Sequence, residues 1–277
     1  MAKLAYSYGY RSIQAIDLVT KREWSLETVA FNAEQFDITD DGTIYYVMKN
    51  GFKKIRQTAV GSGSGADTLF YEHPTYVRDI AVRLVSGNIR VFFRQLARMA
   101  LMQFFYLSEQ KVPIQYYVVN PEDIALYNSC TGKEDWPFYS GDFAFGPNNT
   151  LYISNGNCSP CAIYRISGAG PDDVVGGIER IYQSADAIES LACDDNYIYF
   201  RQSTKTISQL GMVSLWKSDV YTINMGGVHI ADIAIAPEQV LGTPPEPSFL
   251  FIRLAKWVWL RVLQATKKSD QPKPNGC

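Results

Sequence analysis

Four aspartates occupy equivalent places in a sequence phrase that recurs along the chain. In each copy the acidic residue begins a short apolar run, and a turn separates that run from one rich in tyrosine or phenylalanine. The equivalent positions hold Asp37, Asp79, Asp142 and Asp232, with Ser190 at the fifth position and Glu189 beside it. Carboxylate oxygens are preferred ligands of hard cations such as Ca²⁺. If the five positions surround a common axis, we expect a ring of side chains that could bind calcium, with Asn155 and Asn157 as additional ligands.

The same aspartates have a second, structural interpretation. Aspartate side chains beside turns commonly accept hydrogen bonds from nearby backbone N–H groups. In that case each carboxylate would fasten its repeat to the next one, and the ring would have no ligand. The sequence leaves both interpretations open.

The recurring phrase predicts the elements that position these residues. Each copy reads as two short strands joined by a turn, and a third and a fourth strand-like run follow it, for example at residues 162–166 and 179–182. Repetition of such a unit every ~40 to 60 residues is typical of β-propellers, whose blades have four strands. The content of 18 Tyr and 14 Phe agrees with an all-β protein. We therefore predict a β-propeller of five blades.

The two ends of the repeat region predict how the ring closes. Residues 4–8, 12–16 and 23–28 resemble the second, third and fourth strands of a blade that lacks its first strand. Residues 232–236 could supply that strand, and pairing the terminal strands in one blade would remove exposed sheet edges. Six blades are the alternative, if residues 249–263 form strands of their own.

The pattern is similar to the TolB-like propeller superfamily, which includes the YWTD, NHL and gluconolactonase-like families. The residues that carry the resemblance are 142–154, 161–166 and 232–237. The resemblance extends over residues 4–240 and implies the fold, with six blades as the usual number. Gluconolactonase-like and strictosidine-synthase-like members imply a metal-assisted hydrolase or lyase, in which a channel cation polarises a carbonyl and an aspartate acts as base. The metal-binding triad of those families has no match that we could align in this chain.

Composition excludes some classes of partner. The net charge is −2 and 19% of the residues are charged, so no basic field favours nucleic acid. The N-terminus lacks an apolar segment of the length that a secretory signal needs, so we expect a cytoplasmic protein or an extracytoplasmic one that has been processed.

Three segments interrupt the repeat. Residues 121–139 form a long connection whose Trp136, Phe138 and Tyr139 are candidates for a binding surface. Residues 93–105 are unusually apolar, which either a longer hairpin packed between blades or a shift of the reading frame would explain. We assign residues 1–243 to the propeller, 244–268 to a proline-rich linker and an amphipathic segment, and 269–277 to a disordered tail. The amphipathic segment could pack on the propeller, bind a partner or lie on a membrane surface, and a shifted frame would explain residues 248–277 as well.

The cysteines and histidines give weaker signals. Cys158 and Cys161 have the spacing of a local disulfide or of half a zinc site, but no second pair or nearby histidine completes four ligands. We predict a disulfide or two thiols. His73 and His229 are expected to be ordinary loop residues, since no further histidine is present to build a catalytic or metal centre.

Two functions follow from these features. The first is a non-catalytic propeller that presents a loop face to a protein or glycan partner. The alternative is a calcium-assisted hydrolase or lyase that uses the central channel. We predict the first.

Overall fold

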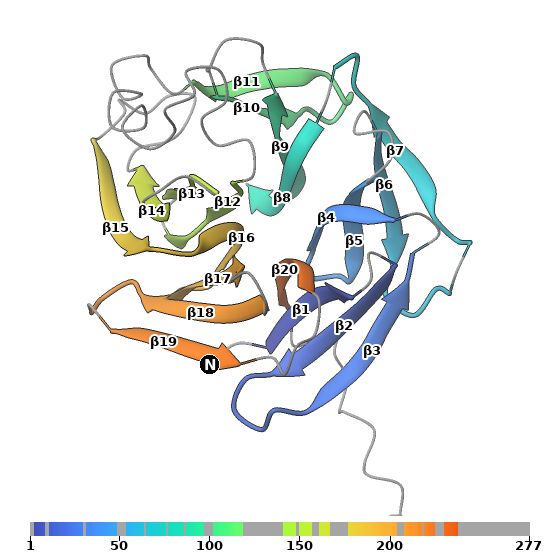
Figure 1. Cartoon of the computed structure of the whole chain (residues 1–277). Helices are drawn as coiled ribbons and strands as arrows, with labels where there is room; N and C mark the ends of the chain where they lie inside the picture. Colours follow the sequence, from blue (N-terminus) through green and yellow to red (C-terminus); the bar gives the residue numbers. More distant parts are fainter. Residues whose placement is uncertain are drawn as a thin grey trace, which may run out of the picture. The chain divides into compact units, whose positions relative to one another are not determined.

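The computed structural model describes residues 3–8, 11–29, 32–48, 54–63, 65–75, 77–85, 87–96, 102–118, 141–147, 150–156, 161–166, 177–203, 208–217, 219–224 and 230–237. These residues form five four-stranded antiparallel sheets arranged as a ring (Figure 1). The predicted all-β propeller of five blades is thereby confirmed.

The strands of each blade are given in order from the innermost strand outward. Blade 1 contains β20 (Ile230–Ala236), β1 (Lys3–Tyr8), β2 (Ser12–Asp17) and β3 (Glu23–Thr28). Blade 2 contains β4 (Ala33–Ile38), β5 (Thr43–Met48), β6 (Lys54–Ala59) and β7 (Thr68–Glu72). Blade 3 contains β8 (Val77–Val85), β9 (Asn88–Leu96), β10 (Met102–Leu107) and β11 (Pro113–Val118). Blade 4 contains β12 (Phe143–Phe145), β13 (Leu151–Ser154), β14 (Cys161–Ile166) and β15 (Ile178–Ser184). Blade 5 contains β16 (Ala187–Cys193), β17 (Tyr197–Ser203), β18 (Ser208–Ser214) and β19 (Val220–Asn224).

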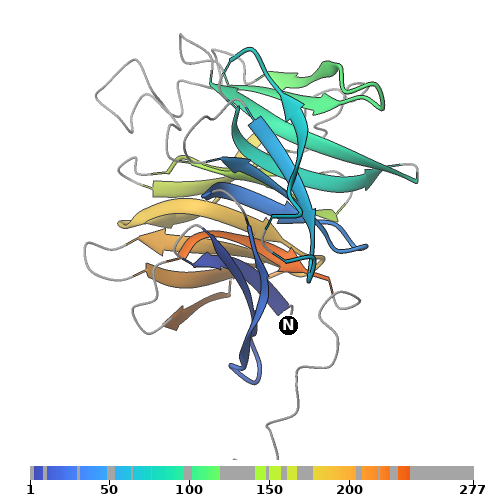
Figure 2. The ribbon, with the colours of Figure 1, turned by 90° about the vertical axis from the view of Figure 1, so that its right-hand side faces the viewer.

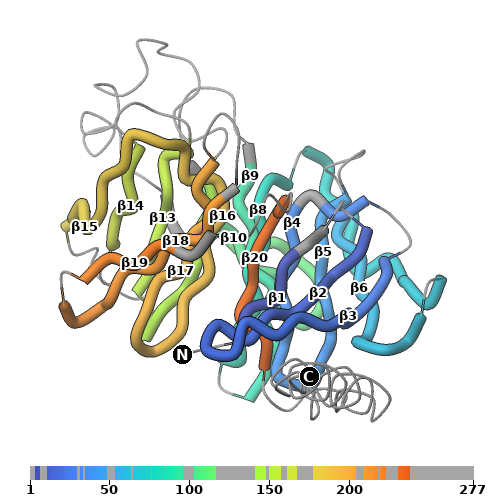
Figure 3. Tube along the Cα trace, turned by 60° about the horizontal axis from the view of Figure 1, so that its bottom comes forward, coloured from blue at the N-terminus to red at the C-terminus, as the bar shows by residue number. Residues whose placement is uncertain are grey.

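The ring closes in blade 1, where strands from the two ends of the repeat region lie side by side. β1 pairs antiparallel with β20, with Lys3 opposite Ala236 and Tyr6 opposite Ile233. Figure 3 shows β20 in orange-red beside the dark blue β1. The predicted closure is confirmed, and residues 232–236 belong to the strand that supplies it.

The hydrophobic core is divided among the five interfaces between neighbouring blades. Second strands such as β5 are buried on both faces because each blade packs against a neighbour on either side. Five clusters of buried apolar side chains result, one per interface, and aromatic rings are frequent in them. Between blades 3 and 4, for example, the rings of Phe104 and Phe143 meet edge to face with centroids 5.1 Å apart.

Blade 3 has the longest inner strands, with nine residues in both β8 and β9. Their hairpin, teal in Figure 2, projects at one side of the ring, and Gly87 has the positive φ of 81° that its turn needs. The apolar segment expected to break the repeat contributes β9 and β10. Phe104 of this segment packs between blades 3 and 4 with the preceding Phe92, and Phe93 packs between blades 2 and 3 with Leu107. This is the packing expected of a longer hairpin.

Two kinds of turn share one face of the ring. Because successive strands of a blade are antiparallel, the turn from the first to the second strand and the turn from the third to the fourth lie at the same end. We call this end the turn face. The innermost strands all run toward it.

The chain divides into two compact units, Met1–Leu241 and Gly242–Cys277, and every described residue belongs to the first. The predictions for residues 244–268 and 269–277 therefore lie outside the described residues. Within the described part of the chain, no helix has the length and apolarity needed to cross a membrane.

Candidate functional site

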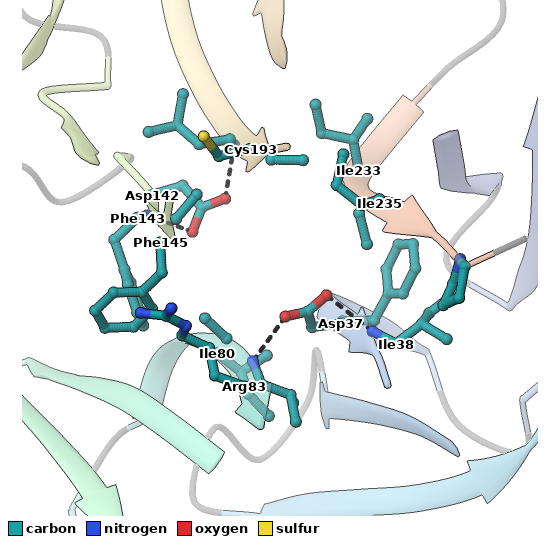
Figure 4. Close-up of a pocket in the computed structure, with 18 of the residues that line it drawn as sticks. Asp37, Ile38, Ile80, Arg83, Asp142, Phe143, Phe145, Cys193, Ile233 and Ile235 are labelled. Atoms are coloured by element: carbon teal, nitrogen blue, oxygen red, sulfur yellow. Dashed lines mark hydrogen bonds between the residues drawn. The ribbon is translucent and has the colours of Figure 1, made fainter. Parts of the chain in front are cut away.

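The five innermost strands surround a cavity of about 150 Å³. Its wall runs from Phe36 and Asp142 to the turn-face ends of the strands, where Asp40, Cys193 and Pro237 lie. Asp37 and Asp142 point into it from different sides (Figure 4). Most of the other lining residues are apolar, and the ionisable side chains that line the cavity besides these two carboxyl groups are Asp40, Arg83 and Cys193.

Asp37, on β4, connects blade 2 to blade 3. Its Oδ2 accepts a hydrogen bond of 2.7 Å from the backbone N–H of Val82 on β8, and its Oδ1 accepts one of 2.8 Å from Ile38. Burial raises the pKa of Asp37 to about 7, although both hydrogen bonds favour the charged form.

Asp142 makes the same connection from blade 4 to blade 5. Its Oδ2 accepts from the N–H of Leu191 on β16 at 2.8 Å, and its Oδ1 accepts from Phe143 at 2.7 Å. Burial, followed by the negative charges of Asp232 and Asp79, raises the pKa of Asp142 well above its usual range.

Asp232 and Ser190 connect blade 1 to both of its neighbours. Oδ2 of Asp232 accepts from the N–H of Phe36 on β4 at 2.7 Å, which links blade 1 to blade 2. Ser190 Oγ accepts from the N–H of Ile233 on β20 at 3.1 Å, which links blade 5 to blade 1, and it donates to Oδ1 of Asp232. Burial raises the pKa of Asp232 to about 7. A serine hydroxyl thus does in blade 5 what a carboxylate does elsewhere.

Asp79, on β8, is the exception among the ring positions. It forms an ion pair with Arg94 on the adjacent strand β9, and Arg94 is 3% exposed. The guanidinium Nη2 donates to the carbonyl oxygen of Gly141 at 2.7 Å, immediately before β12. Burial raises the pKa of Asp79, while the charges of Arg94 and Arg78 oppose that shift. Blade 3 is therefore connected to blade 4 through an arginine.

The ring positions together make one inter-blade connection at each of the five interfaces. These contacts are the ones expected if the aspartates fasten each repeat to the next. Each carboxylate oxygen of Asp37 and Asp142 already accepts a backbone hydrogen bond.

The remaining predicted ligands are placed elsewhere. Glu189 pairs with Arg201 at 2.6 Å and does not line the cavity, and Asn155 Oδ1 accepts from the N–H of Ala162 at 2.6 Å. Asn157 lies outside the described residues. Among the residues that the structure describes, no three His, Cys, Asp or Glu side chains are grouped to hold a metal ion. The calcium site remains a prediction.

Several other predicted residues cannot be placed. Trp136, Phe138, Tyr139 and Cys158 lie outside the described ranges, as does His229. Cys161 is buried on β14, and its pairing with Cys158 stays a prediction.

His73 is buried among aromatic rings, 5.1 Å from the centroid of Phe93. Its Nδ1 accepts from the N–H of Thr75 at 3.2 Å, and burial lowers the pKa of the imidazole. These contacts are those of a packed loop residue, as the sequence predicted.

Arg94 is the residue of the ring that sequence reasoning missed. It lies in the apolar segment, where its charge looked incidental. The signal was available in the pairing of strands, because Arg94 lies directly opposite Asp79 in the register of β8 and β9.

Comparisons with known proteins give the fold a context. No family model matches the sequence, and no curated protein matches it. Among solved structures, the chain is similar to the crystal structure of TolB from Acinetobacter baumannii, with a TM-score of 0.51 and 9% sequence identity. The match covers 86% of this chain and 67% of that one. At such low identity the likeness shows the fold alone, and it confirms the predicted resemblance to TolB-like propellers.

Proposed function

We propose that the protein is a non-catalytic β-propeller scaffold that binds a protein or glycan partner through one of its loop faces. The observation that carries the proposal is that the ring residues serve as hydrogen-bond acceptors between blades. Asp37, Asp142 and Asp232 each accept a backbone N–H of the neighbouring blade, so the most chemically capable side chains of the channel hold the blades together.

The turn face supports a binding role. The large apolar side chains that are exposed among the described residues lie in its turns or within two residues of them. They are Val19, Leu69, Leu84, Ile89, Val112, Ile114, Trp216, Val220 and Tyr221. They are distributed over blades 1, 2, 3 and 5, so the turn face offers apolar contacts at several places around the ring. A membrane surface as a partner of residues 244–268 stays a prediction.

The second candidate function is a calcium-assisted hydrolase or lyase. The observation that favours it is the cavity itself, because Asp37 and Asp142 both reach it and the pKa of Asp37, about 7, suits a general acid or base near neutral pH. Against it, burial explains the raised pKa of both carboxyl groups, and each group already accepts two backbone hydrogen bonds. The carboxylates of Asp37, Asp40 and Asp142 would supply only part of the six to eight oxygen ligands that calcium takes.

One experiment separates the two functions. Thermal unfolding of the full chain would be followed with and without Ca²⁺, Mg²⁺, Mn²⁺ and Zn²⁺, together with an assay of a lactone and ester panel. For a scaffold we expect the same Tm with and without each metal and no hydrolysis of the lactones and esters. Screens with a glycan array and a displayed peptide library should then identify a ligand whose binding saturates. A Tm increase with calcium that Asp142→Asn abolishes, accompanied by calcium-dependent hydrolysis, would replace the scaffold by the enzyme.

A further inference from the structure

Two turns of blade 5 are joined on the turn face and hold a tryptophan in an exposed position. The turn between β16 and β17 contains Asp195 and Asn196, and the turn between β18 and β19 contains Leu215 and Trp216. The N–H of Leu215 donates to the carbonyl oxygen of Asn196 at 2.8 Å, and the indole Nε1 of Trp216 donates to that of Asp195 at 3.1 Å. Trp216 is nevertheless 70% exposed. The indole is therefore both positioned and available for contact, at a low further cost in side-chain entropy.

A second aromatic side chain lies close to this turn. Tyr221 is exposed at the start of β19, just after the turn that carries Trp216. The negative charge of Asp219, which also forms a side-chain hydrogen bond with Tyr221, raises the pKa of the phenol, so the two side chains are neighbours. We call Trp216, Tyr221, Asp195 and Asp219 the Trp216 surface.

The net charge of this surface is negative. Asp194 accepts hydrogen bonds from the N–H groups of Asn196 and Tyr197 and from the hydroxyl of Tyr199. Asp195 and Asp219 are exposed, and none of the ion pairs among the described residues involves either one. Against these carboxylates the two turns contain one cation, Lys217.

The turn face of blade 3 provides a contrast. Its exposed aliphatic side chains, such as Leu84 and Ile89, are accompanied by Arg83 and Arg90 on the same hairpin. The guanidinium of Arg90 lies 4.7 Å from the centroid of the Tyr106 ring. The negative character of the Trp216 surface is thus local to blade 5 and is not shared by the whole turn face.

We propose that the Trp216 surface binds arginine or lysine side chains of a partner protein. This inference rests on the proposed function and assigns its partner to the protein class. An exposed indole face is the best aromatic acceptor for a cation, and neighbouring carboxylates add a Coulomb attraction. Tryptophan, tyrosine and arginine are also the residues that dominate binding energy at protein interfaces.

The charge argues against other occupants. A neutral glycan could stack on the indole but would gain nothing from the net negative charge. An anionic membrane surface would be repelled by Asp195 and Asp219. A basic, flexible segment of a protein can interact with both the indole of Trp216 and the neighbouring carboxylates.

The test uses the full chain and a phage-displayed library of random dodecapeptides. Peptides enriched on the protein would be synthesised in two forms, with arginine and with its neutral isostere citrulline, and their affinities measured by fluorescence polarisation. We expect the enriched sequences to contain arginine or lysine, and the citrulline form to bind about ten-fold more weakly. Trp216→Leu and Asp195→Asn should each weaken the arginine form to a similar extent.

Glu109→Gln is the matched control. Glu109 is an exposed acid in a turn of blade 3 on the same face, so its substitution changes the net charge as Asp195→Asn does. We expect it to leave the affinity unchanged, and Tm measurements should show that all variants are folded. An equal loss in Glu109→Gln would show general attraction of cations and overturn the proposal.

The remaining outcomes separate this inference from the proposed function. Peptides without basic residues, peptides that keep their affinity for Trp216→Leu, or a glycan ligand would overturn the Trp216 surface as a cation site and leave the scaffold function standing. No ligand of any class, together with calcium-dependent hydrolysis, would overturn both.

Discussion

The interface between blades 3 and 4 differs from the other four in the direction of its inter-blade hydrogen bond, because the side chain donates instead of accepting. At four interfaces an acceptor side chain on one innermost strand takes the N–H of the next innermost strand. Between blades 3 and 4 a donor, Arg94, reaches a backbone carbonyl instead, and Asp79 is committed to neutralising it. The comparison shows that every interface has such a connection while the chemistry that makes it can vary.

The two kinds of inter-blade connection differ in how much stability is lost when one residue is replaced. A single carboxylate or hydroxyl that accepts a backbone N–H can be replaced at moderate cost. A buried ion pair depends on both partners, since removing one leaves the other charged and desolvated. The blade 3 and 4 interface compensates with packing, because the rings of Phe92, Phe104, Phe143 and Phe145 all meet there.

The largest effect should come from Arg94→Met. It leaves Asp79 buried without its partner and removes the donor to the Gly141 carbonyl, so we expect the free energy of unfolding to fall by about 3–5 kcal/mol. Urea denaturation followed by circular dichroism measures the change. The double variant Asp79→Leu/Arg94→Met should recover most of the loss, because it removes the unpaired charge. A loss below about 1 kcal/mol in the single variant would contradict the importance of the pair.

The direct connections predict how stability depends on pH. Asp37 and Asp232 have a pKa of about 7 in the folded protein against the ordinary value of 3.8. Such groups bind protons more tightly when folded, so their contribution is complete below pH 3.8 and is lost as the pH rises through 7. We expect each of these two groups to lower the free energy of unfolding by about 2–3 kcal/mol between pH 5 and pH 8. Asp37→Asn should make this fall shallower, and a stability that rises over the same range would refute the assignment.

Ser190→Ala tests the hydroxyl that replaces a carboxylate. The N–H of Ile233 would lose its acceptor and Oδ1 of Asp232 would lose a donor, both in a buried setting. We expect a loss of about 1–2 kcal/mol in the free energy of unfolding. Ser108→Ala serves as the comparison, because its hydroxyl accepts the N–H of Val112 at an exposed turn. That variant should stay within about 0.5 kcal/mol of the parent.

The smallest effect on stability should come from Trp216→Leu, which lies outside the ring. Its side chain is exposed, so we expect a change within about 0.5 kcal/mol. Differential scanning calorimetry would detect a larger change. A loss as large as that of Ser190→Ala would mean that Trp216 packs as part of the fold. The indole would then not be available to a partner, and the proposed binding surface would be contradicted.

The fold could be predicted because its signals are local. The recurring aspartate, the apolar run and the turn are readable within a dozen residues, and the strand missing from blade 1 could be matched to residues 232–236 by the same phrase. The sequence phrase misplaced the ring position of blade 2. Asp232 takes the N–H that follows Gln35, as Asp142 takes the N–H that follows Ser190, so Gln35 is the counterpart of the other ring residues. Asp37 lies two residues further along β4 and takes the N–H of Val82. The partners of the ring residues were not all predictable, because the acceptor of Arg94 is a carbonyl 47 residues away in the next blade.

The Trp216 surface could not be predicted for a related reason. Whether an aromatic side chain in a turn is buried or exposed depends on how the turns of neighbouring strands meet. The contact of Trp216 with Asp195 joins two turns that are 21 residues apart. The sequence directed attention to Trp136, Phe138 and Tyr139 instead, whose placement lies outside the described residues.

The sharing of blade 1 between β1 and β20 has a consequence for biosynthesis. During translation β1, β2 and β3 emerge first, yet their innermost partner is synthesised more than 200 residues later. Until then β1 remains an open edge, and pairings this distant in sequence are slow to form. Closure of the ring therefore has to wait until β20 has been synthesised, and a nascent chain stalled before β20 would expose a strand ready to pair with another molecule.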